Sequence, residues 1–328
     1  MTTTDPVTLE VLRNKLDGIA NEMQSTLLRS SFSPIVKEGL DASACLFSVS
    51  GETLSQSISI PIHLATLIPV IKTFLEYFPL NSLAADDLLV MNDPYMGGTH
   101  LPDIAVAMPI MHQGQPIAIA AAMTHHQDVG GMAPGSVPTN ATEIFQEGIR
   151  IPPLKLRDNG VMNATFVAMM RQNVRMPDAF MGDLNAQIAA CTVGARRLDE
   201  VAGKYGAPTL LRVFDELLDR SEQMTRASLR AIPDGAYSYT DYLDNDGIEL
   251  DKPIPIQVCV RVEDGRLSCS FEGTAPQVRG PFNCVPSGTA AELVQPPSGP
   301  VDQAPSERGL VVIPDVMGMR PLFDDLVA

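Results

Sequence analysis

The stretch that decides the fold reads HLPDIAVAMPIMHQGQPIAIAAAMTHH and covers residues 100–126. It contains two apolar runs, at residues 104–111 and 116–123, which flank a polar, glycine-containing tetrapeptide at 112–115. Two strand-like runs joined by such a turn are typical of a β-hairpin. We therefore expect an antiparallel pair of strands here, with histidines and a carboxylate at its open end.

The position of the turn determines which residues face each other across the hairpin. With the turn centred within residues 112–115, Asp103 is expected opposite Thr124, and His100 opposite Gln127. Neighbouring strands lie about 4.8 Å apart. Side chains that are distant in the sequence should therefore meet at the open end.

The chain on either side of the hairpin shows both helical and strand periodicity. Asp5 can cap a helix that begins at Pro6. Apolar residues then recur at three- and four-residue steps, as expected for an amphipathic helix. Further helices are expected at residues 62–78, 184–202 and 210–229. Strands are expected at 42–49 and 88–92, and at 256–262 and 267–271 with a turn at 263–265 between them.

These elements predict an α+β fold, in which mixed helices and antiparallel hairpins form a metal-binding domain. That catalytic domain is expected to cover residues 1–232, because Pro233-Asp234-Gly235 breaks the last helix. A small β-rich region is expected at 233–286. Residues 287–328 are rich in proline and lack periodicity, which indicates an irregular tail.

Composition excludes several classes of protein. Of 328 residues, 45% are hydrophobic and 19% are charged, a balance typical of a globular chain. The formal net charge of −16 would repel a phosphate backbone or an anionic membrane surface, so neither nucleic acid nor membrane is expected as a partner. The apolar runs are far shorter than the roughly 20 residues needed to span a bilayer.

The cysteines and the N-terminus favour a cytoplasmic protein. The five cysteines are odd in number and widely spaced, with no CxxC pair. Reduced thiols are therefore expected, and a cysteine zinc site is not. Residues 1–6 have neither the basic start nor the apolar core of a secretory signal.

Imidazole and carboxylate groups gather at the open end of the predicted hairpin. His100 and Asp103 are three residues apart on a proline-containing turn, and His125 or His126 arrives from the opposite strand. Because adjacent strand residues point to opposite faces, only one of these two histidines is expected as a ligand. Asp41, just before its own strand, could add a fourth donor. Three such ligands with open positions suit catalytic Zn, Mn or Fe(II).

The remaining polar residues have ordinary as well as functional interpretations. We interpret His63 and His112 as ordinary core or surface residues. Glu143, Glu147 and Arg150 could serve acid–base or substrate-orienting roles, or could form a solvated face with an ion pair.

Two common motifs are absent from the sequence: the P-loop, which binds nucleotides, and the elbow that carries a nucleophilic serine. There is no GxxxxGK[ST] loop and no GxSxG elbow, so ATP binding by a P-loop and α/β-hydrolase chemistry are not indicated. Residues 93–98 could form a backbone anion nest or simply a tight turn.

Several long motifs together resemble the hydantoinase B/oxoprolinase family, which includes N-methylhydantoinase B, caprolactamase, and acetone and acetophenone carboxylase subunits. The resemblance covers about residues 5–291, and residues 92–103 are its most specific part. The motifs are KEGLDAS at 37–43, NDPYMGGTHLPD at 92–103, THHQDVGG at 124–131, QEGIRIPP at 146–153, NVR at 173–175, GDLNAQ at 182–187, DYLD at 241–244 and GPFN at 280–283.

The resemblance implies a metal site and a partner. Its ligands would be Asp41, His100, Asp103 and His125, holding a divalent metal such as Zn, Mn or Fe. In the family, a separate A-type subunit with an actin-like ATPase fold binds ATP and phosphorylates the carbonyl oxygen of the substrate. The B-type subunit then completes hydrolysis or carboxylation at its metal.

The same resemblance suggests catalytic residues close to these ligands. His126 and Asp128 would orient a ligand or shuttle protons. Together with Glu147, whose acid–base role is inferred from the residue itself, they form the expected catalytic set.

The leading interpretation is the metal-binding B-type subunit of an ATP-dependent, hydantoinase/oxoprolinase-like hydrolase of a cyclic amide, working in a cytoplasmic hetero-oligomer. The first alternative is a ketone carboxylase subunit of the acetone or acetophenone type. The second is a truncated, non-catalytic remnant that only binds its partner. This last alternative arises because family members usually continue through a glycine-rich C-terminal region, whereas the resemblance here ends near Ala291.

Overall fold

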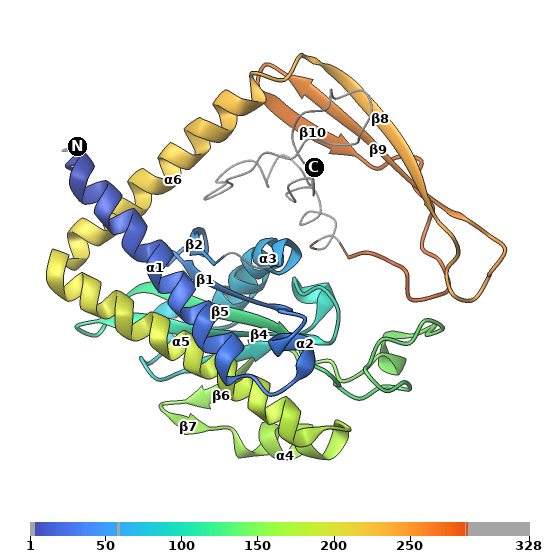
Figure 1. Cartoon of the computed structure of the whole chain (residues 1–328), viewed down its shortest axis with the longest axis horizontal. Helices are drawn as coiled ribbons and strands as arrows, with labels where there is room; N and C mark the ends of the chain where they lie inside the picture. Colours follow the sequence, from blue (N-terminus) through green and yellow to red (C-terminus); the bar gives the residue numbers. More distant parts are fainter. Residues whose placement is uncertain (1–3, 58–59, 286, 288–328) are drawn as a thin grey trace.

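The computed structural model describes residues 4–57, 60–285 and 287. Its centre is a seven-stranded sheet in the order β2-β1-β5-β4-β3-β6-β7, and every neighbouring pair is antiparallel. Helices cover both faces of this sheet (Figure 1), so the predicted α+β class is confirmed. The strands are β1 (Ala42–Phe47), β2 (Thr53–Gln56), β3 (Leu88–Met91), β4 (Asp103–His112), β5 (Gln115–His125), β6 (Leu154–Asp158) and β7 (Val161–Met162).

β4 and β5 form the hairpin that the sequence predicts. Gln113 and Gly114 join them, with φ angles of 50° and 77°. Two successive positive φ values are characteristic of the type I′ turn, whose twist matches that of the flanking strands. A bulge between Ile110 and Met111 then shifts the pairing by one residue for the rest of the hairpin.

This bulge corrects the predicted register. Asp103 pairs with His125 and not with Thr124, because β5 contributes one extra residue at the bulge. The expected pairing of His100 with Gln127 is also wrong, since His100 precedes β4 and has no strand partner. The change moves a histidine directly opposite a carboxylate.

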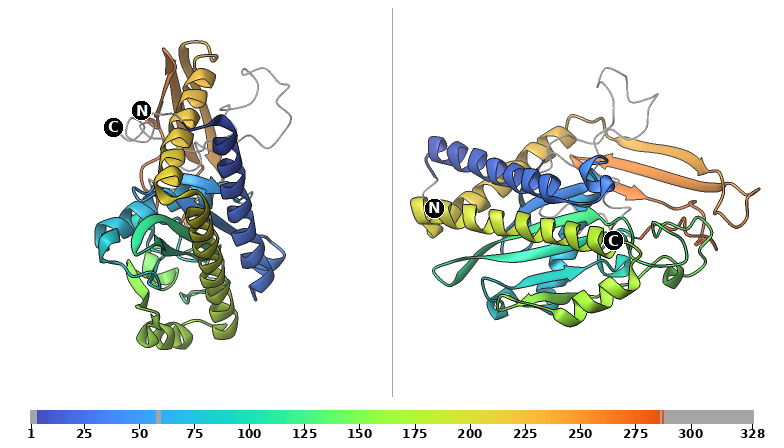
Figure 2. Two further views of the ribbon diagram at one scale, coloured as in Figure 1. Left: turned by 90° about the vertical axis from the view of Figure 1, so that its left-hand side faces the viewer. Right: turned by 60° about the horizontal axis from the view of Figure 1, so that its bottom comes forward.

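Two long helices lie on one face of the sheet and a third covers the other face (Figure 2). On the first face are α1 (Pro6–Ser30) and α5 (Pro177–Tyr205), and on the second is α3 (Pro61–Tyr77). Asp5 caps α1, as predicted, by accepting a hydrogen bond from Thr8 N. The other helices are α2 (Pro34–Lys37), α4 (Ala164–Asn173) and α6 (Ala207–Leu229), with short 3-10 turns at Leu80–Ser82, Pro94–Met96 and Ile144–Gln146.

Alternation along the strands divides the core in two. In β1, Leu46 belongs to the core under α1 and α5, whereas Phe47 belongs to the core under α3. Both side chains are fully buried. α1 and α5 approach closely because Gly194 of α5 lacks a side chain: a Cβ there would lie 2.5 Å from Met23 Sδ. The sheet is therefore buried on both faces, which fixes its register strongly.

Beyond α6 the chain forms a second, three-stranded antiparallel sheet in the order β10-β9-β8. Its strands are β8 (Gly235–Leu243), β9 (Ile254–Glu263) and β10 (Arg266–Ser270). Figure 1 shows α6 and this sheet as an arch above the main sheet. The predicted boundary near residue 232 falls between α6 and β8, and it stays a prediction. The expected tail, residues 287–328, lies outside the described residues except for Ser287.

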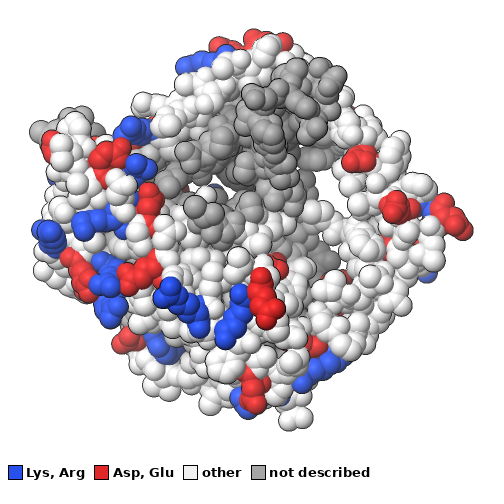
Figure 3. Space-filling view, viewed as in Figure 1, with Lys and Arg blue, Asp and Glu red and all other residues white. Residues whose placement is uncertain are grey.

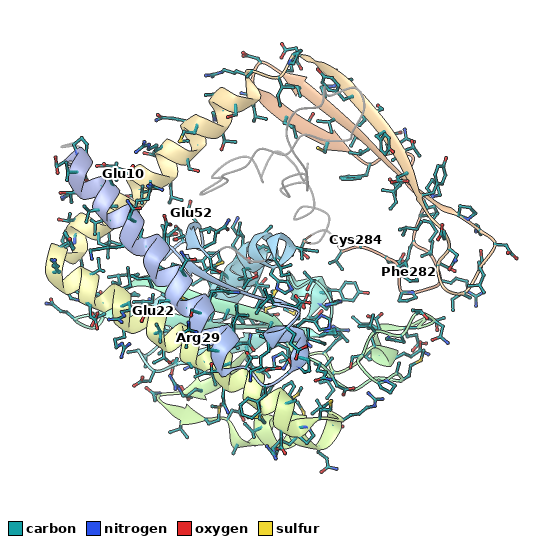
Figure 4. The ribbon with its side chains drawn as sticks, viewed as in Figure 1. Glu10, Glu22, Arg29, Glu52, Phe282 and Cys284 are labelled. Carbon is teal, nitrogen blue, oxygen red and sulfur yellow. The ribbon has the colours of Figure 1, made fainter. Side chains whose placement is uncertain are left out.

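The chain returns from the arch to the main body. The N–H groups of Arg279 and Gly280 donate to Asp246 Oδ2 at 3.2 Å. Phe282 and Cys284 lie on this returning segment (Figure 4). Ser287 Oγ then donates to Gly98 O at 2.7 Å, so the segment contacts the loop that precedes β4.

Charged side chains of both signs mix on the face seen in Figure 3. One pair, Glu22 of α1 and Arg197 of α5, lies 2.8 Å apart (Glu22 is labelled in Figure 4). Such partly exposed pairs add about 0–1 kcal/mol each. Among the described helices, none combines the length and the apolar character required to cross a bilayer.

Candidate metal centre

Three neighbouring strands bring the candidate ligands together. Asp103 is the first residue of β4, and its cross-strand partner His125 is the last residue of β5. On the other side of β5, Ala42 of β1 pairs with Thr124, and His125 N donates to Asp41 O at 3.1 Å. The two carboxylates therefore flank the histidine from the strands on either side of it.

The loop that carries His100 is held by a buried asparagine. The amide of Asn92 donates to Leu101 O at 2.6 Å and to Ile149 O at 2.9 Å, while its oxygen accepts from Ile151 N at 2.6 Å. One side chain thus ties the loop before β4 to the segment before β6. The position of His100 depends on this buried polar bridge.

Two glycines allow this loop to pack against α3. Gly97 has a φ of 107°, and a Cβ there would lie 2.9 Å from the carbonyl carbon of Pro69. A Cβ at Gly98 would lie 2.9 Å from Asp93 O. Side chains at these positions would force the loop away from its neighbours, and we therefore assign the glycine pair a steric role.

The distances between the ligand atoms fit a divalent cation. His100 Nε2 lies 3.2 Å from His125 Nδ1 and 3.2 Å from Asp103 Oδ2, and His125 Nδ1 lies 3.5 Å from Asp103 Oδ1. Metal–ligand bonds of about 2.0–2.1 Å at tetrahedral angles would separate neighbouring ligand atoms by about 3.3 Å. One ligand atom from each of these three residues lies within 4.8 Å of the other two.

Asp41 adds a second carboxylate beside this set. Its Oδ2 lies 3.7 Å from His125 Nδ1. Asp103 Oδ1 is buried and has no aligned hydrogen-bond donor among the described residues. An orphaned buried carboxylate oxygen between imidazoles is the environment in which a cation would satisfy the unmet charge.

The pKa values of these groups shift in the directions expected for imidazoles and carboxylates held close together. Burial by itself would lower the pKa of His100, but the charges of Asp103 and Asp41 outweigh it, so the pKa is raised. Burial by itself would raise the pKa of Asp103, but the imidazoles of His63 and His100 hold it well below its usual range. An ionised carboxylate beside imidazoles is a donor set that can bind a metal ion when the imidazoles release their protons.

His63 lies beside the same carboxylates, which the sequence did not indicate. It is 2% exposed, and its Nε2 lies 3.3 Å from Asp103 Oδ1 and 3.4 Å from Asp41 Oδ1. It comes from α3, in a different layer from the ligand-bearing strands. Its interpretation as an ordinary core residue misses this contact, and no spacing in the sequence reveals it.

His126 points to the opposite face of the sheet from the cluster, toward α5. Its Nε2 lies 3.0 Å from Gln187 Oε1, and its backbone N–H donates to Pro102 O at 2.8 Å. Gln187 Nε2 in turn donates to Ile104 O at 2.7 Å and Ala122 O at 3.1 Å. Burial lowers the pKa of His126. These contacts link the β4–β5 hairpin to α5 on the face of the sheet away from the cluster. The side chain of His126 is therefore not brought together with those of the cluster.

Asp128 is also engaged away from the cluster. Its Oδ1 accepts from Gly130 N and Arg175 N at 3.0 Å, and its Oδ2 accepts from the Arg175 guanidinium at 2.8 Å. Burial by itself would raise the pKa of Asp128, but these hydrogen bonds lower it. Arg175 also donates to three carbonyls of the following loop, those of Gly130, Gly131 and Ala133. This is the geometry of a loop anchor.

Glu147 is the expected catalytic residue that interacts with His100. It is half-buried, and burial raises its pKa despite the opposing charge of His100. A carboxyl group of raised pKa beside a metal site is suited to acid–base work. Arg150, three residues on, forms the ion pair that the sequence left open, at 2.9 Å from Asp93.

The remaining candidates lie apart from the cluster. His112 is at the other end of the hairpin, 2.7 Å from Asp199. Glu143 is exposed. Residues Pro94–Met96 form a single 3-10 turn after Asp93, whose side chain accepts from Tyr95 N. The compact-turn interpretation of this segment is thus supported.

Comparison with known proteins agrees with this architecture. The sequence model of the family described as Hydantoinase B/oxoprolinase matches residues 5–299, slightly beyond the resemblance near Ala291. The β subunit of caprolactamase from Pseudomonas jessenii is 35% identical over 268 residues, which cover 81% of this chain and 46% of that protein.

Two solved structures share the fold. The crystal structure of the ATP-dependent caprolactamase from Pseudomonas jessenii superimposes with a TM-score of 0.82 and 34% identity, covering 89% of this chain and 50% of that one. Nucleotide-free acetone carboxylase also gives a TM-score of 0.82, at 22% identity, covering 88% and 40% respectively. At that identity the second likeness concerns the fold alone.

The chain spans about half the length of the caprolactamase subunit that it matches. The match nevertheless includes every strand of the main sheet and all candidate ligands. This chain belongs to the hydantoinase B/oxoprolinase family.

Proposed function

We propose that this chain is the metal-binding B-type subunit of an ATP-dependent hydrolase of cyclic amides. In this proposal a separate A-type subunit binds ATP and phosphorylates the carbonyl oxygen of the ring amide. The likeness to an enzyme whose title names it an ATP-dependent caprolactamase supports this reaction class.

One observation carries the proposal: the convergence of His100, Asp103 and His125 at the open end of the β4–β5 hairpin. With Asp41 beside them, these residues would hold Zn, Mn or Fe. A bound cation would supply Lewis acidity and lower the pKa of water toward 7.

The chemistry requires one proton acceptor that also acts as a donor. After phosphorylation, water adds to the ring carbon, and the C–N bond breaks with a proton delivered to nitrogen. The resulting acyl phosphate is hydrolysed by a second water, which releases a carboxylate and inorganic phosphate. Glu147 would take the proton from water and pass it to the ring nitrogen, since its pKa is raised by burial beside His100.

Reconstitution tests this function. The purified chain would be stripped of metal, reloaded with Mn²⁺, Zn²⁺ or Fe²⁺, and mixed with an A-type subunit, ATP and a small ring amide. Phosphate release and ring-opened product should require both subunits and one of the metals. His100→Ala should abolish both signals and metal retention, whereas His112→Ala, at the far end of the hairpin, should retain them.

The alternatives give different results in the same assay. ATP turnover on a ketone that depends on bicarbonate would indicate a carboxylase, the first alternative raised by the family resemblance. Binding of the A-type subunit without any metal in non-chelating buffer would indicate a non-catalytic subunit and would exclude the proposed hydrolase.

A further inference from the structure

We infer that His63 is a positioning residue of the metal centre: its imidazole lies beside the Oδ1 atoms of Asp41 and Asp103 and holds the two carboxylates in the orientation in which they face the cation. This inference rests on the proposed metal site and adds to it a residue from a separate structural layer. His63 would act through the carboxylates and would not itself touch the substrate.

The position of His63 is fixed by its own helix. It lies in the first turn of α3 and is 2% exposed. Thr66 Oγ1 donates to Ile62 O at 2.7 Å and lies 3.2 Å from His63 O. The same hydroxyl lies 3.8 Å from Met123 Sδ of β5. The first turn of α3 is therefore packed against the strand that carries His125.

From this position one nitrogen reaches two carboxylates on different strands. His63 Nε2 lies 3.4 Å from Asp41 Oδ1 and 3.3 Å from Asp103 Oδ1. These residues lie at the start of β1 and of β4, which flank β5 on opposite sides. Within the sheet, His125 of β5 lies between the same two carboxylates, with its Nδ1 3.7 Å from Asp41 Oδ2 and 3.5 Å from Asp103 Oδ1. His63 approaches both carboxylates from the helix layer, on α3.

Both oxygens of Asp103 face candidate ligands. Asp103 Oδ1 lies between His63 Nε2, at 3.3 Å, and His125 Nδ1, at 3.5 Å, whereas Asp103 Oδ2 lies 3.2 Å from His100 Nε2 and also accepts from Thr99 Oγ1. Asp41 Oδ2 is the oxygen nearer to His125 Nδ1, at 3.7 Å. Contact with His63 at the two Oδ1 atoms thus sets the orientation of both carboxylates relative to the ligand histidines.

His63 stands outside the ligand set itself. The atoms that lie mutually within 4.8 Å come from His100, Asp103 and His125. The other ring nitrogen, Nδ1, is buried and has no hydrogen-bond partner in the described part of the chain. The polar atoms that the structure records within 4 Å of this ring are carboxylate oxygens at Nε2, and such oxygens accept hydrogen bonds. Contact with the carboxylates, outside the ligand set, is the basis for a positioning role.

Direct metal binding tests this inference without an activity assay. Metal-free wild-type chain would be titrated with Mn²⁺ and followed by electron paramagnetic resonance, with Zn²⁺ measured by competition against a chromophoric chelator. Outer partners of metal ligands typically contribute about 10–100-fold to affinity. His63→Leu should weaken binding by about this factor at unchanged stoichiometry.

Two further variants separate positioning from other roles. His63→Gln retains a side-chain N–H donor and should recover most of the affinity. His112→Leu is the matched control, because that histidine pairs with Asp199 far from the centre, and its affinity should equal that of the wild type. Urea unfolding of each variant would confirm that the compared proteins are folded.

The outcomes distinguish this inference from the proposed function. If His63→Leu folds and binds Mn²⁺ as tightly as the wild type, the positioning role is overturned while the metal site stands. If His63→Gln loses as much affinity as His63→Leu, the imidazole is required as a ligand, and positioning is again overturned. If His63→Leu does not fold, the Mn²⁺ affinity of His63→Gln is the measurement that tests the positioning role. A wild-type chain that binds neither metal would remove the site itself.

Discussion

Asp103 and His125 face each other across β4 and β5, with Asp103 Oδ1 3.5 Å from His125 Nδ1. Both backbone positions are set by the ladder of a sheet that is buried on both faces. The two donors are therefore held by rigid strands, while His100 is supplied by an anchored loop. Such a centre requires little rearrangement to accept a cation, which is a condition for tight and geometrically selective binding.

Replacing the central carboxylate should destroy this centre. Asp103→Asn keeps the shape of the side chain but removes the negative charge that lies beside the imidazoles of His100 and His125. We expect Mn²⁺ affinity to fall by more than about 100-fold, beyond the range of outer partners. Metal content after dialysis, measured by plasma mass spectrometry, would test this. Full occupancy and full activity in Asp103→Asn would contradict its assignment as a ligand.

The buried hydrogen bonds of Gln187 with the β4–β5 hairpin should contribute to the free energy of unfolding. Gln187→Leu removes the acceptor of His126 Nε2 and the donor to Ile104 O and Ala122 O. A buried donor left unsatisfied costs about 1–3 kcal/mol, so the free energy of unfolding in urea should fall by about that amount. Thr192→Ala, on the exposed side of the same helix, is the control and should change little. Equal stability of the two variants would show that the hydrogen bonds of Gln187 do not stabilise the fold.

The sequence predicted the hairpin because its local chemistry is complete: apolar runs, a glycine turn and polar ends all lie within 27 consecutive residues. The register differed by one because a bulge depends on packing and not on local propensity. Strand alternation predicted that only one of His125 and His126 would be a ligand, and the family resemblance selected His125. In the structure His125 lies beside Asp103, whereas His126 contacts Gln187.

Contacts between the helices and the main sheet could not be predicted from the local sequence in the same way. His63 reaches the centre only because α3 packs on one face of the sheet, and nothing in the sequence fixes where that helix begins relative to β4. The partners of Asp128 and His126, namely Arg175 and Gln187, also come from distant parts of the chain. The catalytic roles that the family resemblance suggests for His126 and Asp128 stay predictions, and the contacts that the structure records for them are with Gln187 and Arg175.

The loop-anchor role of Asp128 predicts a pH-dependent loss of stability. Its pKa is lowered in the folded protein, so its contribution is present above the unfolded pKa of about 3.9 and is lost as pH falls through the folded value. Asp128→Asn should lose about 1.5–3 kcal/mol at pH 7. The difference from wild type should stay constant down to about pH 5 and shrink below about pH 4.

Urea unfolding of both proteins across this pH range measures the difference. Metal affinity provides the second readout, because Asp128 contacts Arg175 and backbone N–H groups rather than the ligands. Mn²⁺ binding in Asp128→Asn should remain within a few-fold of wild type. A difference in stability that grows toward acid pH would contradict the lowered pKa.

Removing the acid–base group should separate catalysis from metal binding. Glu147→Gln keeps the size of the side chain but cannot transfer a proton, so turnover in the reconstituted enzyme should fall by about 10²–10⁴-fold while Mn²⁺ binding is retained. The wild-type rate should rise with pH through the raised pKa of Glu147, since the ionised form is the base, and the variant should lack this limb.

The sign of the stability change gives an independent check on the same substitution. Because the folded pKa of Glu147 lies above its unfolded value, ionisation is disfavoured by burial, and stability is lost as pH rises through that pKa. Glu147→Gln should therefore unfold at an equal or higher urea concentration than wild type at pH 7, with the two proteins converging at acid pH. Glu143→Gln, at an exposed position four residues earlier, is the control for turnover. Wild-type turnover in Glu147→Gln would assign the proton transfer to another group, and a destabilised variant at pH 7 would show that the carboxylate is needed for folding instead.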